Sequence, residues 1–163
     1  MRKVIEIEPF FTIESIRMFP DVDFADTFST TNTHNTIDEI TQLVFGTSPS
    51  WVRVLFAIRN NLVRFIGLSV PKPEEKSVKF EVGAYVRFFK IYYFDKDQVI
   101  LGANDSHLNF RAIIFNDNTD NYNIKVSTLV KYNNTKGRYY MKFIKPFHKL
   151  IIKRMMKNAY SNN

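Results

Sequence analysis

Asp105, His107, Asn109 and Arg111 occupy every second position of one short stretch, and their types could do chemistry. If this stretch is a β-strand, the four side chains share one face. A carboxylate can orient a histidine as a general base, and a guanidinium can bind an acidic group. Two interpretations are open. The row lines a cavity, or it is a solvent-wetted outer face with polar pairs between neighbouring strands.

Four further residues could belong to a binding site or to ordinary structure. His148 lies at the margin of an apolar helical stripe, where a histidine is more typical of a hydrogen-bonded core group than of a ligand. Trp51 and Arg59 are either a core residue and a surface cation, or the rim of a pocket for an apolar ligand with an anionic end. His34 is expected to be exposed. No histidine spacing predicts a metal site.

The composition excludes several reaction classes. The 163 residues contain no cysteine, which excludes disulfides, thiolate nucleophiles and cysteine-bound metals. Neither Gly-x-Ser-x-Gly nor Gly-x-Gly-x-x-Gly occurs, so we expect no hydrolase-type nucleophile and no cofactor. Hydrophobic residues make up 45% of the chain and aromatic residues 15%, enough to fill a core or line an apolar cavity. We expect one domain, 1–163.

The elements that would position these residues begin with a strand and two helices. After an irregular segment, 1–20, residues 22–30 alternate weakly and predict a first strand. Thr36 and Glu39 have the spacing of a capping box, which predicts a short helix as far as Phe45.

A second helix and a meander of strands are predicted next. Residues 49–65 start with Ser-Pro and carry apolar residues at helical spacing, so they predict a buried-face helix. The Pro- and charge-rich residues 69–77 predict a loop. Strands separated by turn residues are predicted at 82–94, 99–104, 108–115 and 122–132.

The last predicted element is a long amphipathic helix, kinked or begun at Pro146. Its apolar stripe consists of Tyr140, Ile144, Phe147, Ile151 and Met155, with lysines opposite. This order of elements indicates an α+β fold in which one helix covers a curved antiparallel sheet.

The positive charge of the chain is concentrated at its end. The last 43 residues contain ten Lys/Arg and no acidic residue, a pattern that can bind nucleic acid or an anionic membrane surface. Because most of the aromatic residues of the helix are expected to face the core, we expect weak contact at most, and nucleic-acid binding is not favoured. No apolar run is long enough for a signal peptide or a spanning helix, so a cytoplasmic location is expected.

The order of motifs resembles an uncharacterised bacterial family of the START-like (SRPBCC, polyketide-cyclase-like) superfamily. The resemblance rests on "VDFADTF", "PSWVRVLFAIRN", "GLSV", "VILGANDSHLNF" with Arg111, and "GRYYMKFIKPFHKLI". It implies a helix-grip fold, in which a curved sheet grips a long C-terminal helix around an apolar pocket. It also implies a separate partner resembling short-chain dehydrogenases, since the family occurs fused to such NAD-binding domains. Gly83-Ala84 stands where the family commonly has Gly-Asp.

We therefore expect a binding module for a small apolar molecule, a lipid or polyketide-like compound. The ligand-binding candidates are Trp51, Arg59, His107, Arg111 and His148, and the protein is expected to be a monomer or a homodimer. The alternative is a cyclase-, hydratase- or isomerase-like enzyme in which His107 and Asp105 transfer a proton. A third possibility is binding to an anionic surface through the basic helix.

Overall fold

A seven-stranded antiparallel sheet forms the centre of the molecule, in the order β1-β2-β7-β6-β5-β4-β3. The structure is a computed structural model, and it describes residues 2–46, 79–87 and 89–161. The strands are β1 Val4–Ile7, β2 Phe24–Thr30, β3 Tyr85–Val86, β4 Phe89–Phe94, β5 Gln98–Asn104, β6 Leu108–Asn116 and β7 Ile124–Tyr132.

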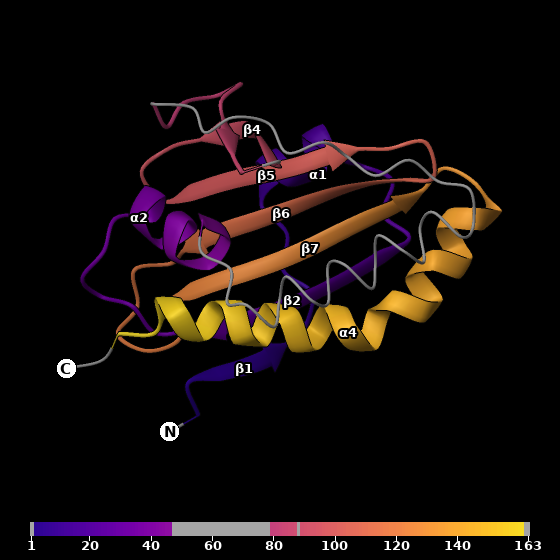
Figure 1. Cartoon of the computed structure of the whole chain (residues 1–163). Coiled ribbons are helices and arrows are strands. Elements are labelled where there is room, and N and C mark those ends of the chain that lie inside the picture. The colour runs from indigo at the N-terminus through magenta and orange to yellow at the C-terminus, as the bar shows by residue number, and fades with distance from the viewer. Residues whose placement is uncertain (1, 47–78, 88, 162–163) are drawn as a thin grey trace.

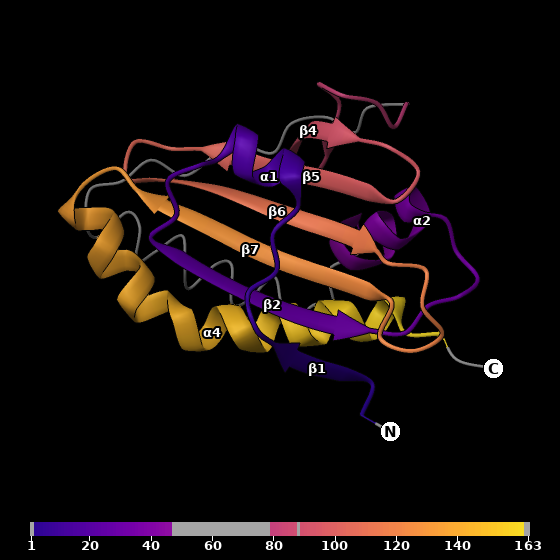
Figure 2. The ribbon, with the colours of Figure 1, turned by 180° about the vertical axis from the view of Figure 1, so that it is seen from behind.

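Helices cover both faces of this sheet. The long helix α4, Thr135–Ala159, lies on one face with α2, Ile37–Thr41, and the π-helical turn η1, Gln42–Gly46 (Figure 1). The short helix α1, Ile13–Met18, lies on the opposite face (Figure 2). The predicted α+β arrangement of a curved antiparallel sheet and a long C-terminal helix is thereby confirmed.

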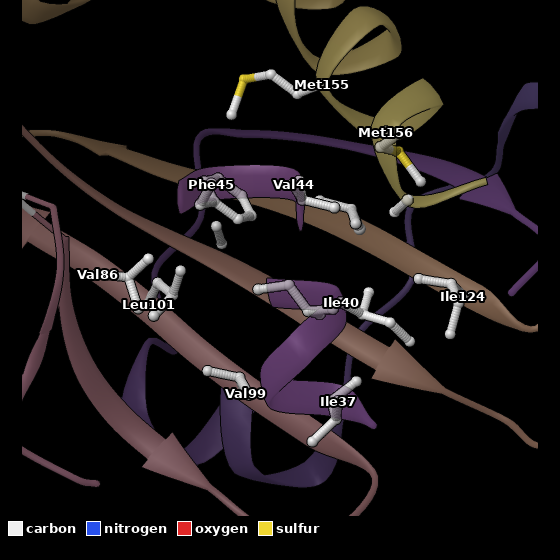
Figure 3. Close-up of a cluster of buried hydrophobic side chains, with 14 of the residues drawn as sticks. Ile37, Ile40, Val44, Phe45, Val86, Val99, Leu101, Ile124, Met155 and Met156 are labelled. Atoms are coloured by element: carbon white, nitrogen blue, oxygen red, sulfur yellow. The ribbon is translucent and has the colours of Figure 1, made fainter. Parts of the chain in front are cut away.

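The main core lies between the sheet and the helices α2, η1 and α4. Val99, Ile114, Val126 and Phe28 form one row across four strands, and all four side chains are fully buried. Figure 3 shows the side chains of α2 and η1 and the methionines of α4 pointing toward this face, where they exclude water from the apolar rows. The labelled members are Ile37, Ile40, Val44, Phe45, Val86, Val99, Leu101, Ile124, Met155 and Met156.

A second apolar cluster covers the opposite face. Phe19, which follows α1, packs on Ile100, Ile113 and Leu129. The helix α1 is held by its N-cap, because the Thr12 hydroxyl accepts a hydrogen bond from the backbone N–H of Ser15. The N-terminal segment, expected to be irregular, thus contains β1 and α1. These two elements are four and six residues long, too short to show a clear period in the sequence.

The helix predicted from Thr36 is confirmed. The Glu39 carboxylate accepts a hydrogen bond from the backbone N–H of Thr36 at 3.0 Å, as expected for a capping box. The helical backbone continues through η1 to Gly46. The predicted helix 49–65 and the loop 69–77 lie outside the described residues.

The strand predicted at 82–94 is wrong as a single element. Tyr85 pairs with Lys90 and Val86 with Phe89, so the chain reverses between them and forms the hairpin β3–β4. Arg87 in this reversal has φ 61°, the left-handed conformation that a tight hairpin turn requires. The three following predicted strands are confirmed as β5, β6 and β7.

The predicted long C-terminal helix is confirmed as α4, but its orientation differs from the predicted stripe. The Asn134 side chain accepts a hydrogen bond from the Gly137 N–H at 3.1 Å and caps the first turn. The helix continues through Pro146 and bends along its length, so the proline is an interior residue rather than the start (Figure 1).

The buried face of α4 consists of Gly137, Met141, Ile152, Met155, Met156 and Ala159. Of the predicted stripe, Met155 is buried, Tyr140, Ile144 and Ile151 are partly buried, and Phe147 is exposed. The prediction that Phe147 faces the core is therefore wrong. The physical reason is the contact of Gly137 with the backbone of His107, which fixes the rotation of the helix about its axis.

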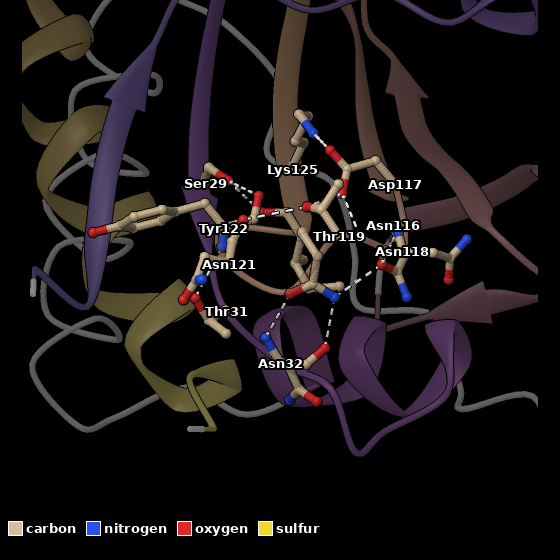
Figure 4. A network of polar contacts seen from close by, with 12 residues as sticks. Ser29, Thr31, Asn32, Asn116, Asp117, Asn118, Thr119, Asn121, Tyr122 and Lys125 are labelled. Atoms are coloured by element: carbon tan, nitrogen blue, oxygen red, sulfur yellow. Dashed lines mark hydrogen bonds and ion pairs between the residues drawn. The ribbon is translucent and has the colours of Figure 1, made fainter. Parts of the chain in front are cut away.

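Polar contacts join the β6–β7 loop to the end of β2 and to α4 (Figure 4). Asn123 and Asn32 exchange two hydrogen bonds, from Asn32 N–H to Asn123 Oδ1 at 2.9 Å and from Asn123 Nδ2 to the Asn32 carbonyl at 2.7 Å. Asn32 Nδ2 also donates to the carbonyl of Ala159 at 2.6 Å, which satisfies an acceptor in the last turn of α4. Both asparagines are buried.

Candidate functional site

A carboxylate and an imidazole meet between β2 and α4. His148 Nε2 lies 3.2 Å from Asp26 Oδ1, and the side chain of Asp26 is 5% exposed. The second carboxylate oxygen, Asp26 Oδ2, is enclosed and has no hydrogen-bond partner. The ring of Phe24 meets the imidazole edge-on at 6.1 Å between centroids. The pair is therefore largely buried, and one carboxylate oxygen accepts no hydrogen bond.

A pocket of about 500 Å³ borders this pair on the side of β1. Asp26 is among its lining residues, which also include Glu6, Ile7, Glu8, Pro9, Phe24, Ala25, Lys145 and Lys149. The pocket thus combines apolar walls with charges of both signs.

Several charged groups around this pocket have a partner. Glu6 accepts a hydrogen bond from Lys149 and lies 3.6 Å from the Nζ of Lys153. The hydrogen bond from Lys149 lowers the pKa of Glu6, and the same bond raises the pKa of Lys149. The ammonium of Lys145 lies over the ring of Phe24, 5.1 Å from its centroid. Asp26 Oδ2 is thus a buried acceptor beside this pocket that receives no hydrogen bond.

The predicted pair Asp105 and His107 lies at the other end of α4. His107 precedes β6, in the β5–β6 turn, and its Nδ1 is 3.5 Å from Asp105 Oδ2. Its side chain is 1% exposed, and its ring meets Tyr140 of α4 edge-on at 5.1 Å. The turn is fastened to the start of α4, since the His107 carbonyl accepts from the Asn133 N–H at 3.0 Å. His107 is therefore enclosed on the side of α4.

Arg111 does not join His107, which corrects the expectation that the alternating residues form one row. Arg111 lies on the face covered by the N-terminal segment, where its guanidinium stacks 3.8 Å from the ring centroid of Tyr92 and 5.0 Å from that of Phe19. Its Nη1 donates to Asn104 Oδ1 and to the Phe110 carbonyl. Burial lowers the pKa of Arg111. The outer-face interpretation holds for its orientation, but the residue is buried rather than wetted.

The two histidine pairs share one face of the sheet. Tyr140, Ile144 and His148 recur at intervals of four residues and so lie on one side of α4. His107 meets the Tyr140 end of this row and Asp26 meets the His148 end, about 12 Å apart along the helix axis. The row is therefore a partly buried strip of α4 with a carboxylate–histidine pair at each end.

The other candidate residues are placed as follows. His34 is exposed, as expected. Trp51 and Arg59 lie outside the described residues. Within residues 2–46, 79–87 and 89–161, no group of three or more His, Asp or Glu side chains could hold a metal ion.

Asp26 was missed by sequence reasoning, although a signal was present. Phe24, Asp26 and Phe28 alternate along β2, and the flanking phenylalanines face the helix side. An acid between two core-facing aromatic residues must therefore face the core as well. Such a buried acid requires a partner, and His148 provides it.

The fold and this strip define a class: an α+β protein whose curved antiparallel sheet holds a long C-terminal helix in a helix-grip arrangement. The chain belongs to the family described as "Protein of unknown function (DUF2867)", whose model matches residues 18–155. No curated protein matches the sequence. No solved structure matches it either. No helix among the described residues is long and apolar enough to cross a membrane.

Proposed function

We propose that this protein binds a small, largely apolar molecule carrying one hydrogen-bond donor, next to the Asp26–His148 pair. The observation that carries the proposal is Asp26 Oδ2, an enclosed carboxylate oxygen without a partner. An unpaired acceptor of this kind costs about 1–3 kcal/mol, and more when it is charged. A ligand hydroxyl, amide or amine that donates to Oδ2 removes this cost and gains a charge-assisted bond.

Part of the wall of the neighbouring pocket is apolar and can contact an apolar ligand body. Ile7, Pro9 and Phe24 line it, and its volume of about 500 Å³ is in the range of small-molecule sites. The negative charge of Asp26 disfavours a ligand whose polar end is itself a carboxylate. A lipid-like or polyketide-like alcohol, phenol or amide fits this combination.

Native mass spectrometry and thermal shift with matched ligands test the proposal. We expect a long-chain alcohol to bind and raise Tm, and the carboxylate of equal chain length to bind more weakly. Asp26→Asn should reduce this preference, because an amide can donate as well as accept. Asp105→Asn removes the acid beside the other histidine and serves as the control. Tighter binding of the carboxylate than of the alcohol would refute head-group recognition. If neither ligand binds, the binding function is refuted.

A second candidate is an enzyme that transfers a proton, of cyclase, hydratase or isomerase type. Two carboxylate–histidine pairs on the same strip favour it, the expected His107 with Asp105 and also His148 with Asp26. A ligand recovered after incubation should then differ in structure or isotope content from the one added. It should be unchanged with His107→Gln or His148→Gln, whichever is the base. If the wild-type protein in deuterated water returns the ligand unchanged, the enzyme hypothesis is refuted and the binding hypothesis is kept.

The proposal also includes the superfamily, the partner, the cellular location and the oligomeric state of the protein. Membership of the START-like superfamily, a separate short-chain-dehydrogenase-like partner, a cytoplasmic location and a monomeric or homodimeric state all rest on the resemblance and the composition described above. The helix-grip arrangement supports the first of these.

A further inference from the structure

One side of α4 exposes a continuous row of large apolar side chains. Tyr139, Phe143, Phe147 and Leu150 are 68, 52, 38 and 57% exposed, and we call these four residues the aromatic stripe. Their spacing of three and four residues places them on one side of the helix, over about 16 Å. The rings of Phe143 and Phe147 stack with centroids 6.0 Å apart. The stripe is thus an organised surface rather than scattered residues.

Positive charge surrounds the aromatic stripe. The sequence of α4 contains eight Lys/Arg and no acidic residue. Lys149 and Lys153 share one carboxylate, Glu6 of β1, which offsets one of their two positive charges. In contrast, Lys136, Lys142 and Lys157 are exposed and form no ion pair with the described part of the chain. The surface therefore combines aromatic rings with uncompensated cations.

From this combination we infer that α4 docks on an anionic lipid surface. Aromatic and leucine side chains are stabilised at the boundary between head groups and acyl chains, where an amphipathic helix lies in the plane of the membrane. Lysines beside them attract anionic head groups. Because α4 forms an outer layer of the molecule, the stripe can reach such a surface without opening the core (Figure 1).

The expectation that most aromatic residues of this helix face the core had argued against such contact. That expectation is wrong for Tyr139, Phe143 and Phe147. A single-stranded nucleic acid also contacts rings and cations, but Leu150 within the stripe offers a base no aromatic surface for stacking. A lipid surface accommodates the leucine and the rings alike, so the stripe favours lipid.

Vesicle flotation at physiological salt tests this inference. The vesicles are neutral phosphatidylcholine alone, or with about a third of anionic phosphatidylglycerol. We expect binding to the anionic vesicles only. Lys136→Gln, Lys142→Gln and Lys157→Gln combined should weaken the partition coefficient by roughly 100-fold, because each lysine near the surface contributes about a factor of five. Lys79→Gln, Lys90→Gln and Lys96→Gln, at exposed positions outside α4, form a charge-matched control that should bind nearly as the wild type.

A second pair of variants tests the rings. Phe143→Ser with Phe147→Ser should weaken vesicle binding by about tenfold or more. Ile13→Ser with Ile16→Ser, exposed apolar residues of α1 on the opposite face of the sheet, should leave binding unchanged.

Three outcomes would overturn the inference. Equal binding to neutral and anionic vesicles would remove the role of charge. A large loss of thermal stability in the phenylalanine variant would show that the stripe is covered within the folded protein. Tighter binding to single-stranded oligonucleotides than to vesicles at the same salt, lost in the same lysine variant, would assign the surface to nucleic acid.

Discussion

The carbonyl oxygen of His107 lies where a side chain on Gly137 would begin: a Cβ at residue 137 would be 2.0 Å from it. This contact brings the first turn of α4 against the β5–β6 turn. Three hydrogen bonds reinforce it, from Asn133 N–H to the His107 carbonyl, from Asn133 Nδ2 to the Asp105 carbonyl and from Asn134 Nδ2 to the Ser106 carbonyl. The position of His107 relative to the first turn of α4 thus depends on Gly137, a residue without a side chain.

Gly137→Ala should destabilise the protein despite the helical preference of alanine. Alanine normally favours a helix interior by about 1 kcal/mol over glycine, whereas forcing atoms into a packed contact costs about 1–3 kcal/mol. We expect a net loss of about 1 kcal/mol in urea unfolding. Lys136→Ala, at the exposed neighbouring position, is the control. A more stable Gly137→Ala protein would show that the contact is looser than described.

Met156→Ala should destabilise the protein by about 2–5 kcal/mol, because this fully buried side chain belongs to the main core. Ile151→Ala should cost clearly less, since Ile151 is only partly buried. Chemical denaturation of the two variants compares them directly. An equal or reversed order would mean that α4 is rotated from the orientation described.

Asn32→Ala should cost about 2 kcal/mol, because it leaves the Ala159 carbonyl and the Asn35 side chain without their donor. Hydrogen exchange should show earlier opening of the last turn of α4 than in the wild-type protein. The exposed Asn121, changed to alanine, provides the comparison and should behave as the wild type. Unchanged exchange in that turn would contradict the role given to Asn32.

Glu6→Gln should lower stability at neutral pH but not in acid. The pKa of Glu6 is lowered in the folded state by the Lys149 hydrogen bond, so its contribution is present above the ordinary pKa of 4.5. The contribution is lost as the pH falls through the lowered folded-state pKa. The effect is small and decreases with salt, since the pair is partly exposed. Thermal melts of the wild type and Glu6→Gln from acid to neutral pH check this prediction, with Glu8→Gln as control. A difference in Tm that does not change with pH would count against the Glu6–Lys149 pair.

Much of the fold follows from local patterns in the sequence. Local secondary structure is predicted by the capping box of Thr36 and Glu39, by the turn residues between β4 and β7, and by the apolar spacing of α4. The prediction that residues from Asp105 to Arg111 share one face was wrong, because their alternation was interpreted as one continuous strand, whereas β6 begins at Leu108. Asp105 accepts from the Ser106 N–H at 2.6 Å, a local side-chain bond typical of turns, and this places His107 in the turn before β6.

The Asp26–His148 pair was harder to predict, because its members are 122 residues apart in the sequence. His148 was recognised from its place beside the helical stripe. The alternation of Asp26 with Phe24 and Phe28 indicates its face, but the position of β2 opposite α4 depends on its pairing with β7, which nearby residues do not show.

The pairing of β2 with β7 also bears on how the protein folds. Thr27 and Ser127 form a hydrogen bond at 2.8 Å across 100 residues, and the intervening strands β3 to β6 form a ladder of neighbouring hairpins. The hairpins can assemble early through local contacts, whereas β1 and β2 must add to the far edge of β7 after a long loop has closed. During synthesis, β2 therefore leaves the ribosome about a hundred residues before its partner and stays without this neighbour until β7 follows.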